Sequence, residues 1–330
     1  MGPTPTLGEV LVAVITARTT TLVELERGAR EDAADAVHQY RVTLRRLRSV
    51  LAAFSAELEP IAAAAALDLP ALSARLRDVA RAFGLARDAE VNGALMAERL
   101  AAGATPAREE VPEARRLLAE AATAEYQRYR TRAIALLDGY GPGTLQAVLT
   151  ALATAVGEDV LGSPEQQGSA RRVSEQQRAG RPGMGQDAEG ALARSIDDQA
   201  ARVLHLARKA KRAAPADAAA ALHEVRKKAK RLRYTIEEVT ELGVEIPPGR
   251  QDVVEAAHDI QEQLGTHHDS VGLAAFVRST VRGRPATGPR AVGTMVAFTA
   301  GELAGAEQAV QRDALRRYRK ARRALRDALT

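Results

Sequence analysis

Two segments of this chain, VHQYRVTLRRLRS at residues 37–49 and LHEVRKKAKRLRY at residues 222–234, are versions of one basic pattern that begins with a histidine. His38 matches His223 at an offset of 185 positions, and an Arg-Leu-Arg triplet follows at the same distance in both segments. Apolar residues recur at intervals of three and four in each segment, and this periodicity predicts a helix. The fold is therefore expected to contain the same basic helix twice.

The basic residues of each predicted helix share one face. At about 100° per residue, a histidine and three cations fall within an arc of about 80° beside the apolar stripe. These residues are His38, Arg41, Arg45 and Arg48 in the first segment and His223, Arg226, Lys230 and Arg233 in the second. Arg46, Lys227 and Arg231 widen the basic field on another side. Like charges at this spacing cost about 0.3 kcal/mol per pair, so the pattern indicates an anionic partner that offsets the repulsion.

The composition is typical of a globular protein. The chain has 330 residues, of which 46% are hydrophobic and 27% charged, and a formal net charge of +5, so it is long enough for one large domain or two ordinary ones. No uninterrupted apolar run approaches the roughly 18 residues of a membrane span, and the first residues, MGPTPTLGEV, do not resemble a secretory signal. We therefore expect a cytoplasmic protein without a membrane partner. The absence of cysteine excludes disulfides and thiolate metal sites.

Helical periodicity extends over almost the whole chain and strand-like alternation is nowhere sustained, so the predicted fold class is all-α. Residues 163–190 are rich in Gly, Ser, Gln and Pro, and we expect a flexible linker there. The linker would separate an amino-terminal half, residues 1–162, from a carboxy-terminal half, residues 191–330. Helices are expected at residues 7–30, 35–57, 70–84, 87–102, 111–138, 143–160, 190–213, 216–241, 250–264, 268–282, 289–310 and 311–328.

The two halves resemble each other beyond the basic helix. FGLARD at residues 83–88 aligns with LGTHHD at residues 264–269 at an offset of 181, and each stretch is expected to form a turn between two helices. Near the end of each half, Tyr129-Arg130 resembles Tyr318-Arg319. A repeat of this length predicts an internal duplication.

The doubled basic pattern, the Gly-to-Asp turn after the next helix and the basic last helix resemble the CHAD family, the conserved histidine α-helical domain. The resemblance extends from Leu7 to Leu329 apart from the linker. It implies two bundles of the four-helix type related by a pseudo-two-fold axis, with basic residues lining a shared groove or pore that binds inorganic polyphosphate, and an association with polyphosphate granules. The chain departs from the family pattern in its long linker and at Thr266-His267-His268, whereas both basic helices keep the pattern.

We therefore expect non-catalytic binding of polyphosphate, with no cofactor or metal and with other granule proteins as possible further partners. Polyphosphate offers only charged oxygens, and arginine supplies planar, bidentate donors to such groups. The pKa of each motif histidine is expected to lie below its ordinary value, because the adjacent arginine repels the charged form. The expected ligands are His38, Arg41, Arg45, Arg46, Arg48, His223, Arg226, Lys227, Lys230, Arg231 and Arg233, followed by Arg130, Arg316 and Arg319.

Nucleic acid is the first alternative partner, because the same cations would hold its phosphate backbone. The aromatic content is only 3%, and the chain has no tryptophan. Surfaces on which bases could stack are therefore scarce, and nucleic acid is not expected to be the main ligand.

The second alternative is a metal-dependent phosphohydrolase, because two His-Asp pairs resemble metal ligands. In the repeat each pair aligns with an Arg-Asp pair, and arginine does not ligate metals. We therefore expect the four aspartates to orient or neutralise nearby basic side chains at helix ends. The pairs are His258-Asp259 and His268-Asp269, aligned with Arg77-Asp78 and Arg87-Asp88. His205 and His267 have no counterpart and are assigned no function.

Overall fold

The computed structural model describes residues 5–102, 111–141, 143–161, 184–214, 217–283 and 293–329. Within these ranges the chain forms ten helices and no strand, apart from one bridge pair between Thr6 and Asp187, which confirms the all-α class. The amino-terminal half contains α1 (Leu7–Glu31), α2 (Ala36–Ala53), α3 (Ser55–Ala64), α4 (Leu69–Ala101), α5 (Val111–Tyr140) and α6 (Thr144–Leu161). The carboxy-terminal half contains α8 (Ala188–Arg212), α9 (Ala218–Thr240), α10 (Gln251–Arg282) and α11 (Thr294–Asp327). Most of the expected linker lies outside the described residues.

Local sequence signals explain where several helices begin. Thr6 and Glu9 form a capping box at α1: the Thr6 hydroxyl accepts from the Glu9 N–H at 3.3 Å, and the Glu9 carboxylate accepts from the Thr6 N–H at 2.8 Å. The Asp68 carboxylate caps α4 by accepting from the Ala71 N–H at 2.8 Å. Helices α1 and α4 therefore begin at residues whose side chains replace a missing backbone acceptor.

The residues that precede α8 lie against the amino terminus. The N–H of Leu7 donates to the carbonyl of Gln186 at 2.9 Å, and the N–H of Gly8 donates to the carbonyl of Met184 at 3.0 Å. Met184 is buried, and α8 begins at Ala188. Residues 184–190 of the segment expected to be a linker thus belong to this contact or to α8.

Three helices are longer than the sequence predicted. Helices α4, α10 and α11 run without a break through the ends expected at residues 84, 264 and 310, so the predicted turns were wrong. A glycine inside a helix costs about 1 kcal/mol relative to alanine, which long and well-packed helices tolerate. Gly84 and Gly265 allow a close contact instead: a Cβ atom at Gly84 would lie 3.2 Å from the Nε of Arg41. Conversely, the helix expected at 35–57 is divided into α2 and α3 at the buried Phe54.

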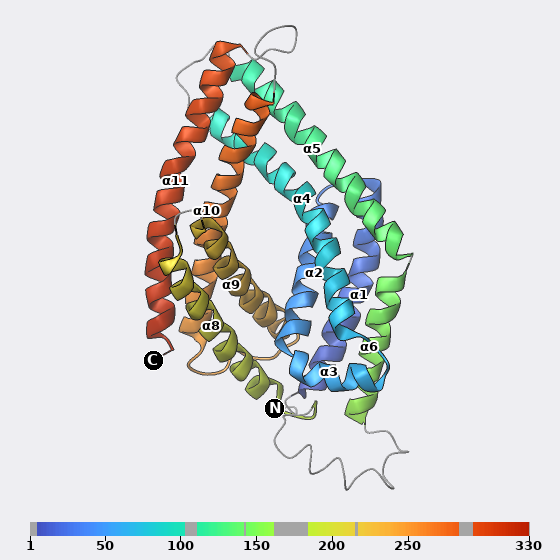
Figure 1. Ribbon diagram of the computed structural model, residues 1–330. Helices are drawn as coiled ribbons and strands as arrows, with labels where there is room; N and C mark the ends of the chain where they lie inside the picture. The colour runs from blue at the N-terminus through green and yellow to red at the C-terminus, as the bar shows by residue number, and fades with distance from the viewer. Residues whose placement is uncertain are drawn as a thin grey trace.

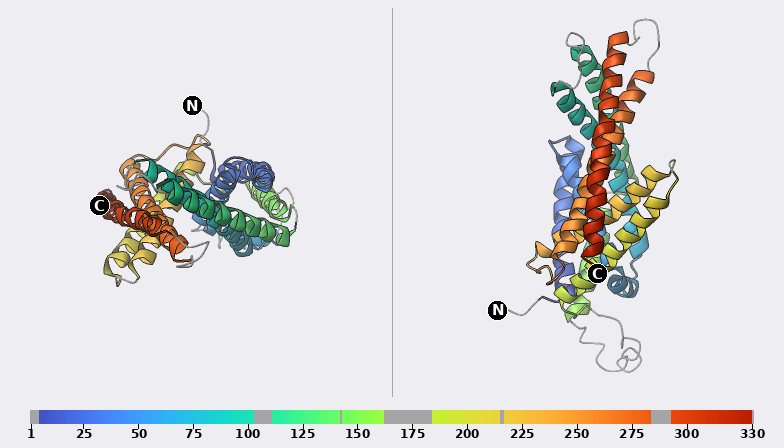
Figure 2. Two further views of the ribbon diagram at one scale, coloured as in Figure 1. Left: turned by 90° about the horizontal axis from the view of Figure 1, so that it is seen from above. Right: turned by 90° about the vertical axis from the view of Figure 1, so that its left-hand side faces the viewer.

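Each half forms a bundle, and the two bundles contact each other in two places, one toward each end of the molecule (Figure 1). Helices α1, α2, α4 and α5 follow one another in the same order as α8, α9, α10 and α11. The main core runs through both halves where α2 packs on α9, with Leu47 and Leu232 fully buried. A second core forms where the distal ends of α4, α5, α10 and α11 meet, with Leu118 and Leu303 buried. Figure 2 shows these distal ends together at one end of an elongated molecule.

Helix α6 is long and apolar enough, by length and composition alone, to span a membrane, with a mean hydropathy of 1.2 over 18 residues. This differs from the expectation that the chain has no such segment. Leu149, Leu152 and Val156 are buried on one face of α6 in the main core, where the helix packs on α1. The opposite face exposes short side chains such as Thr150 and the acid Glu158. In this structure α6 is a wall of the bundle.

Candidate anion-binding site

Helices α2 and α9, which carry the repeated segments, pack on each other where the bundles meet (Figure 1). Ion pairs join the middle of α2 to the carboxy-terminal end of α9: Arg46 lies 3.1 Å from Glu237, 3.3 Å from Glu238 and 2.8 Å from Glu241, the residue that follows α9. Arg18 of α1 also contacts Glu238 at 2.5 Å. Because Glu238 is only 1% exposed, this network fixes how the two helices approach each other.

Basic side chains of both helices gather beside this contact. Six of them form what we call the central basic cluster: Arg41, Arg45 and Arg48 of α2 with Arg226, Lys230 and Arg231 of α9. All six are half-buried. Of these six cations, only Arg41 and Arg226 lie close enough to an acid of the described residues for an ion pair. The cluster is therefore a partly desolvated concentration of positive charge in which six cations face two paired aspartates, Asp88 and Asp269.

Burial and mutual repulsion disfavour the charged forms of these side chains. Burial, followed by repulsion from neighbouring arginines, lowers the pKa of Arg45 and of Arg48 to about 10. The same causes lower the pKa of Lys230 to about 6. The arginines therefore remain charged at neutral pH, whereas Lys230 is mostly uncharged there in the free protein. An anion bound among them would favour the charged form of every member.

Each half places one arginine against its next long helix in the same way. The guanidinium group passes a glycine of that helix and lies near an aspartate one turn further on, with nitrogen–oxygen distances of 3.8 Å and 3.9 Å in the two halves. The Nε atoms of both arginines are buried without a hydrogen-bond partner among the described residues. The two sets are Arg41, Gly84 and Asp88, and Arg226, Gly265 and Asp269. These aspartates do face cations, but from the interior of α4 and α10 rather than from helix ends. The predicted duplication requires such a correspondence.

The two motif histidines are half-buried near the cluster. His38 has a buried Nδ1 without a partner among the described residues, and burial followed by the charge of Arg87 lowers its pKa. His223 lies against His268, with ring centroids 5.1 Å apart and ring planes at 42°. Burial and His268, ahead of Arg226, lower the pKa of His223. The expected direction of both shifts is confirmed, but the adjacent arginines are not their main cause.

Three ligands expected from the repeated segments point to acids instead of to the cluster. Arg46 belongs to the network described above. Arg233 donates to Glu237 at 2.5 Å and to the side-chain oxygen of Gln261 at 2.6 Å. Lys227 pairs with Glu224 at 2.8 Å, although it lines the same pocket as part of the cluster.

The three expected ligands outside the repeated segments do not join the cluster either. Arg130 donates to the backbone carbonyl of Ala29 at 2.9 Å and lies 3.2 Å from Asp32, so it joins α5 to the end of α1. Arg316 of α11 is exposed and pairs with Asp313. Arg319 is exposed on the same helix.

Sequence reasoning missed two cations that the structure adds to the site. Arg77 of α4 and Lys228 of α9 line one pocket of about 310 Å³ together with Arg45, Arg48 and Lys230. Arg77 lies outside the repeated segments, within the helix expected at residues 70–84. The one indication in the sequence is that Arg77 aligns with His258 in the repeat, which places a basic residue at the same position in both halves.

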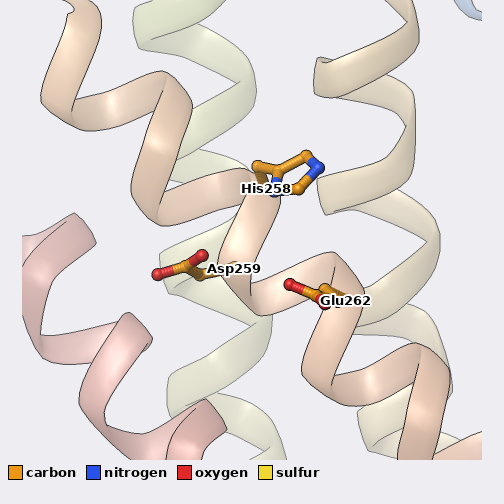
Figure 3. Close-up of side chains that lie close together, drawn as sticks. All are labelled: His258, Asp259 and Glu262. Atoms are coloured by element: carbon orange, nitrogen blue, oxygen red, sulfur yellow. The ribbon is translucent and has the colours of Figure 1, made fainter.

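One group of side chains could hold a metal ion. His258, Asp259 and Glu262 are exposed on α10, and their ligand atoms all lie within 4.8 Å of one another (Figure 3). Nitrogen and carboxylate oxygen donors suit zinc and related divalent ions. His268 and Asp269, the other pair considered, are not part of this group, since they lie beside His223 and Arg226.

The family model that matches this chain is the CHAD domain, over residues 13–278. The chain belongs to the CHAD domain family. The match covers the repeated segments on α2 and α9 and both contacted aspartates. It thereby confirms the resemblance seen in the doubled histidine-led pattern.

Relatives and solved structures agree with this assignment. Uncharacterised proteins from two strains of Mycobacterium tuberculosis are 32% identical over 281 residues, which are 82% of this chain but 45% of theirs. The chain thus spans less than half the length of these curated relatives. The crystal structure of the CHAD domain from the plant Ricinus communis matches with a TM-score of 0.64 at 23% identity, covering 98% of this chain and 94% of that one. PptA from Streptomyces chartreusis matches with a TM-score of 0.60 at 17% identity, covering 96% and 99%. These two likenesses concern the fold.

Proposed function

We propose that this CHAD domain binds inorganic polyphosphate at the central basic cluster without catalysis, and that it thereby associates with polyphosphate granules. One observation carries the proposal: six cations from both halves are packed together and partly buried, and only two of them have an acid of the described residues at ion-pair distance. Such an arrangement destabilises the free protein and favours a ligand of high, regularly repeated negative charge. Family membership supports the same ligand class.

The surroundings of the cluster favour polyphosphate over nucleic acid. Tyr234 lines the pocket that holds Arg45, Arg48 and Lys230, but it is only 5% exposed. Lys230 and Arg46 cover its ring, at 5.3 Å and 5.9 Å from the centroid. A base would find no free aromatic face there, whereas phosphate oxygens would meet several guanidinium donors.

The proposal is tested by replacing Arg41, Arg45 and Arg48 with glutamine and measuring binding of tripolyphosphate, long-chain polyphosphate and duplex DNA in one buffer. We expect both polyphosphates to bind much more weakly. Each lost phosphate contact should also flatten the dependence of log affinity on log salt by about 0.7, by analogy with single-stranded nucleic acids. Folding should survive, because the change relieves repulsion.

A matched control keeps the net charge change but leaves the cluster intact. Arg116, Arg128 and Arg132 are exposed on α5, and their replacement with glutamine should leave affinity nearly unchanged. Equal losses in the two triple variants would show that binding depends on overall charge and not on the cluster. Affinity of the parent protein for duplex DNA that equals its affinity for long-chain polyphosphate would overturn the choice of ligand.

A further inference from the structure

Positive charge continues beyond the central basic cluster toward α8. The pocket of about 310 Å³ that holds Arg45, Arg48 and Lys230 is also lined by Arg231 and Glu224 of α9. Repulsion from Arg202, an exposed residue of α8, contributes to a lowered pKa of Arg231 after burial, its first cause. The cluster is therefore in electrostatic contact with the exposed face of α8.

A second pocket, of about 720 Å³, lies between α8 and α9 and shares Glu224 with the first. Its cations are Arg208, Lys209 and Arg212 of α8. Of its two acids, Glu224 is already paired with Lys227, and Asp217 precedes the first turn of α9, where the helix dipole favours an acid. The α8 side of this pocket therefore carries three cations, Arg208, Lys209 and Arg212, and no acid.

A third pocket, of about 450 Å³, lies between α8 and α11 and shares Arg208 and Arg212 with the second. No acid lines it among the described residues. Its remaining cations are Lys211, Arg322, Arg323 and Arg326. Arg326 pairs with Asp327 at 2.7 Å, whereas Arg322 and Arg323 make no ion pair with any described residue. In Figure 1, α8 lies between α9 and α11, so the second and third pockets border α8 on its two sides. The first pocket, which α2, α4 and α9 line, adjoins the second at Glu224.

We propose that these three pockets form one anion track along which a long polyphosphate chain leaves the central basic cluster, crosses α8 and ends against α11. The inference rests on the proposed function. Shared lining residues support a single ligand, because Arg208 and Arg212 face the second and third pockets at once. A continuous phosphate chain needs cations at each step, and this path supplies them with little opposing charge.

The track makes affinity depend on chain length. From Arg202 to Arg212 the helix alone extends about 15 Å, at 1.5 Å per residue, so a tripolyphosphate held in the central basic cluster does not reach α11. A long chain anchored in the cluster meets the track cations at a high effective concentration, because its second contact is intramolecular. Long chains therefore bind more tightly than short ones without any change in the central site.

The test uses a track variant in which Arg212, Arg322 and Arg323 are replaced by glutamine. Binding of tripolyphosphate should keep its affinity and stoichiometry. Binding of long-chain polyphosphate should weaken at least tenfold, and its salt slope should fall by about 2, from three lost contacts at about 0.7 each. Circular dichroism and thermal unfolding check that the fold is unchanged, as expected because Arg212 and Arg323 are exposed and Arg322 is only half-buried.

Three results would overturn the track. The first is unchanged long-chain affinity, and the second is an equal loss for both ligands. The third is a lower tripolyphosphate stoichiometry, which would mean separate sites and not one path. Failure of the proposed function looks different: the triple variant of Arg41, Arg45 and Arg48 would then bind tripolyphosphate as the parent does. The α5 control triple reports the effect of net charge alone.

Discussion

Lys230 offers the sharpest test of the idea that the central basic cluster lowers the stability of the free protein. Its ordinary pKa of 10.5 is lowered to about 6 by burial and the surrounding arginines. Keeping such a lysine uncharged at pH 7 corresponds to about 3.5 pKa units, or about 5 kcal/mol at 1.36 kcal/mol per unit. Replacement by methionine, a good helix former of similar length, removes this penalty.

One effect reduces the expected gain. The side chain is only partly buried, so solvent screens some of the repulsion. Its contact with the ring of Tyr234 at 5.3 Å adds no cation–π stabilisation at pH 7, because the lysine is mostly uncharged there. We expect Lys230→Met to raise the free energy of unfolding by about 3 kcal/mol at pH 7. The same variant should bind polyphosphate more weakly, because the ligand would otherwise meet a protonated lysine.

The pH dependence identifies the cause. Between about pH 6 and 10.5 the unfolded chain holds a proton on Lys230 that the folded protein lacks, so the parent loses stability as the pH falls through this window. The gain of the variant should therefore be larger at about pH 6 than at about pH 9 in urea denaturation. Lys227→Met, on the exposed side of the same helix, is the matched control. A destabilised variant, or a gain that is equal at both pH values, would refute the reasoning.

Three further outcomes are expected. Arg46→Met should lower the free energy of unfolding by about 3 kcal/mol in urea denaturation, because it leaves Glu238 buried with one partner fewer; an unchanged value would contradict the role given to this network. Polyphosphate affinity should rise from about pH 8 to 5.5, because binding raises the lowered pKa of both motif histidines, and the double change His38→Gln and His223→Gln should reduce this slope in fluorescence titrations. Phosphate release from polyphosphate should be absent with or without divalent metal, and metal-dependent release that His258→Ala abolishes would favour the hydrolase.

Helix periodicity was sufficient to predict the fold class and the paired basic helices, because both depend on contacts within one segment. The continuity of α4 and α10 was not predictable in this way. Glycine is common in turns, so Gly84 and Gly265 favoured a turn in the sequence. In the structure each glycine makes room for an arginine from another helix, Arg41 or Arg226. A glycine that admits a neighbouring side chain and a glycine that ends a helix look alike in a single sequence.

The candidate site shows the same limit. Arg45 and Arg46 are neighbours in the sequence and carry the same charge, but their side chains point about 100° apart on the helix. Arg45 therefore enters the cluster, whereas Arg46 faces acids on α9 that follow about 190 residues later in the chain. Helical periodicity showed that the two side chains point in different directions. It did not show that acids of another helix face Arg46 and not Arg45. In the sequence, Lys230 likewise resembles the other basic residues of its helix, and only the structure shows the arginines around it. Because its pKa is lowered to about 6, Lys230 contributes together with the two motif histidines to the expected pH dependence of polyphosphate affinity.

The two bundles are joined at both ends by glutamates that are almost fully buried. Glu238 contacts Arg18 and Arg46 across one end, and Glu307 of α11 contacts Arg99 of α4 at 3.1 Å across the other. The cations between these ends cannot separate to relieve their repulsion, so they are preorganised before any ligand arrives. A polyanion then completes the charge balance that folding leaves open, and it should raise the unfolding temperature with its concentration, as RT ln(1 + [L]/Kd) requires. If the domain binds polyphosphate as proposed, its stability in a cell would follow the rise and fall of the polyphosphate level.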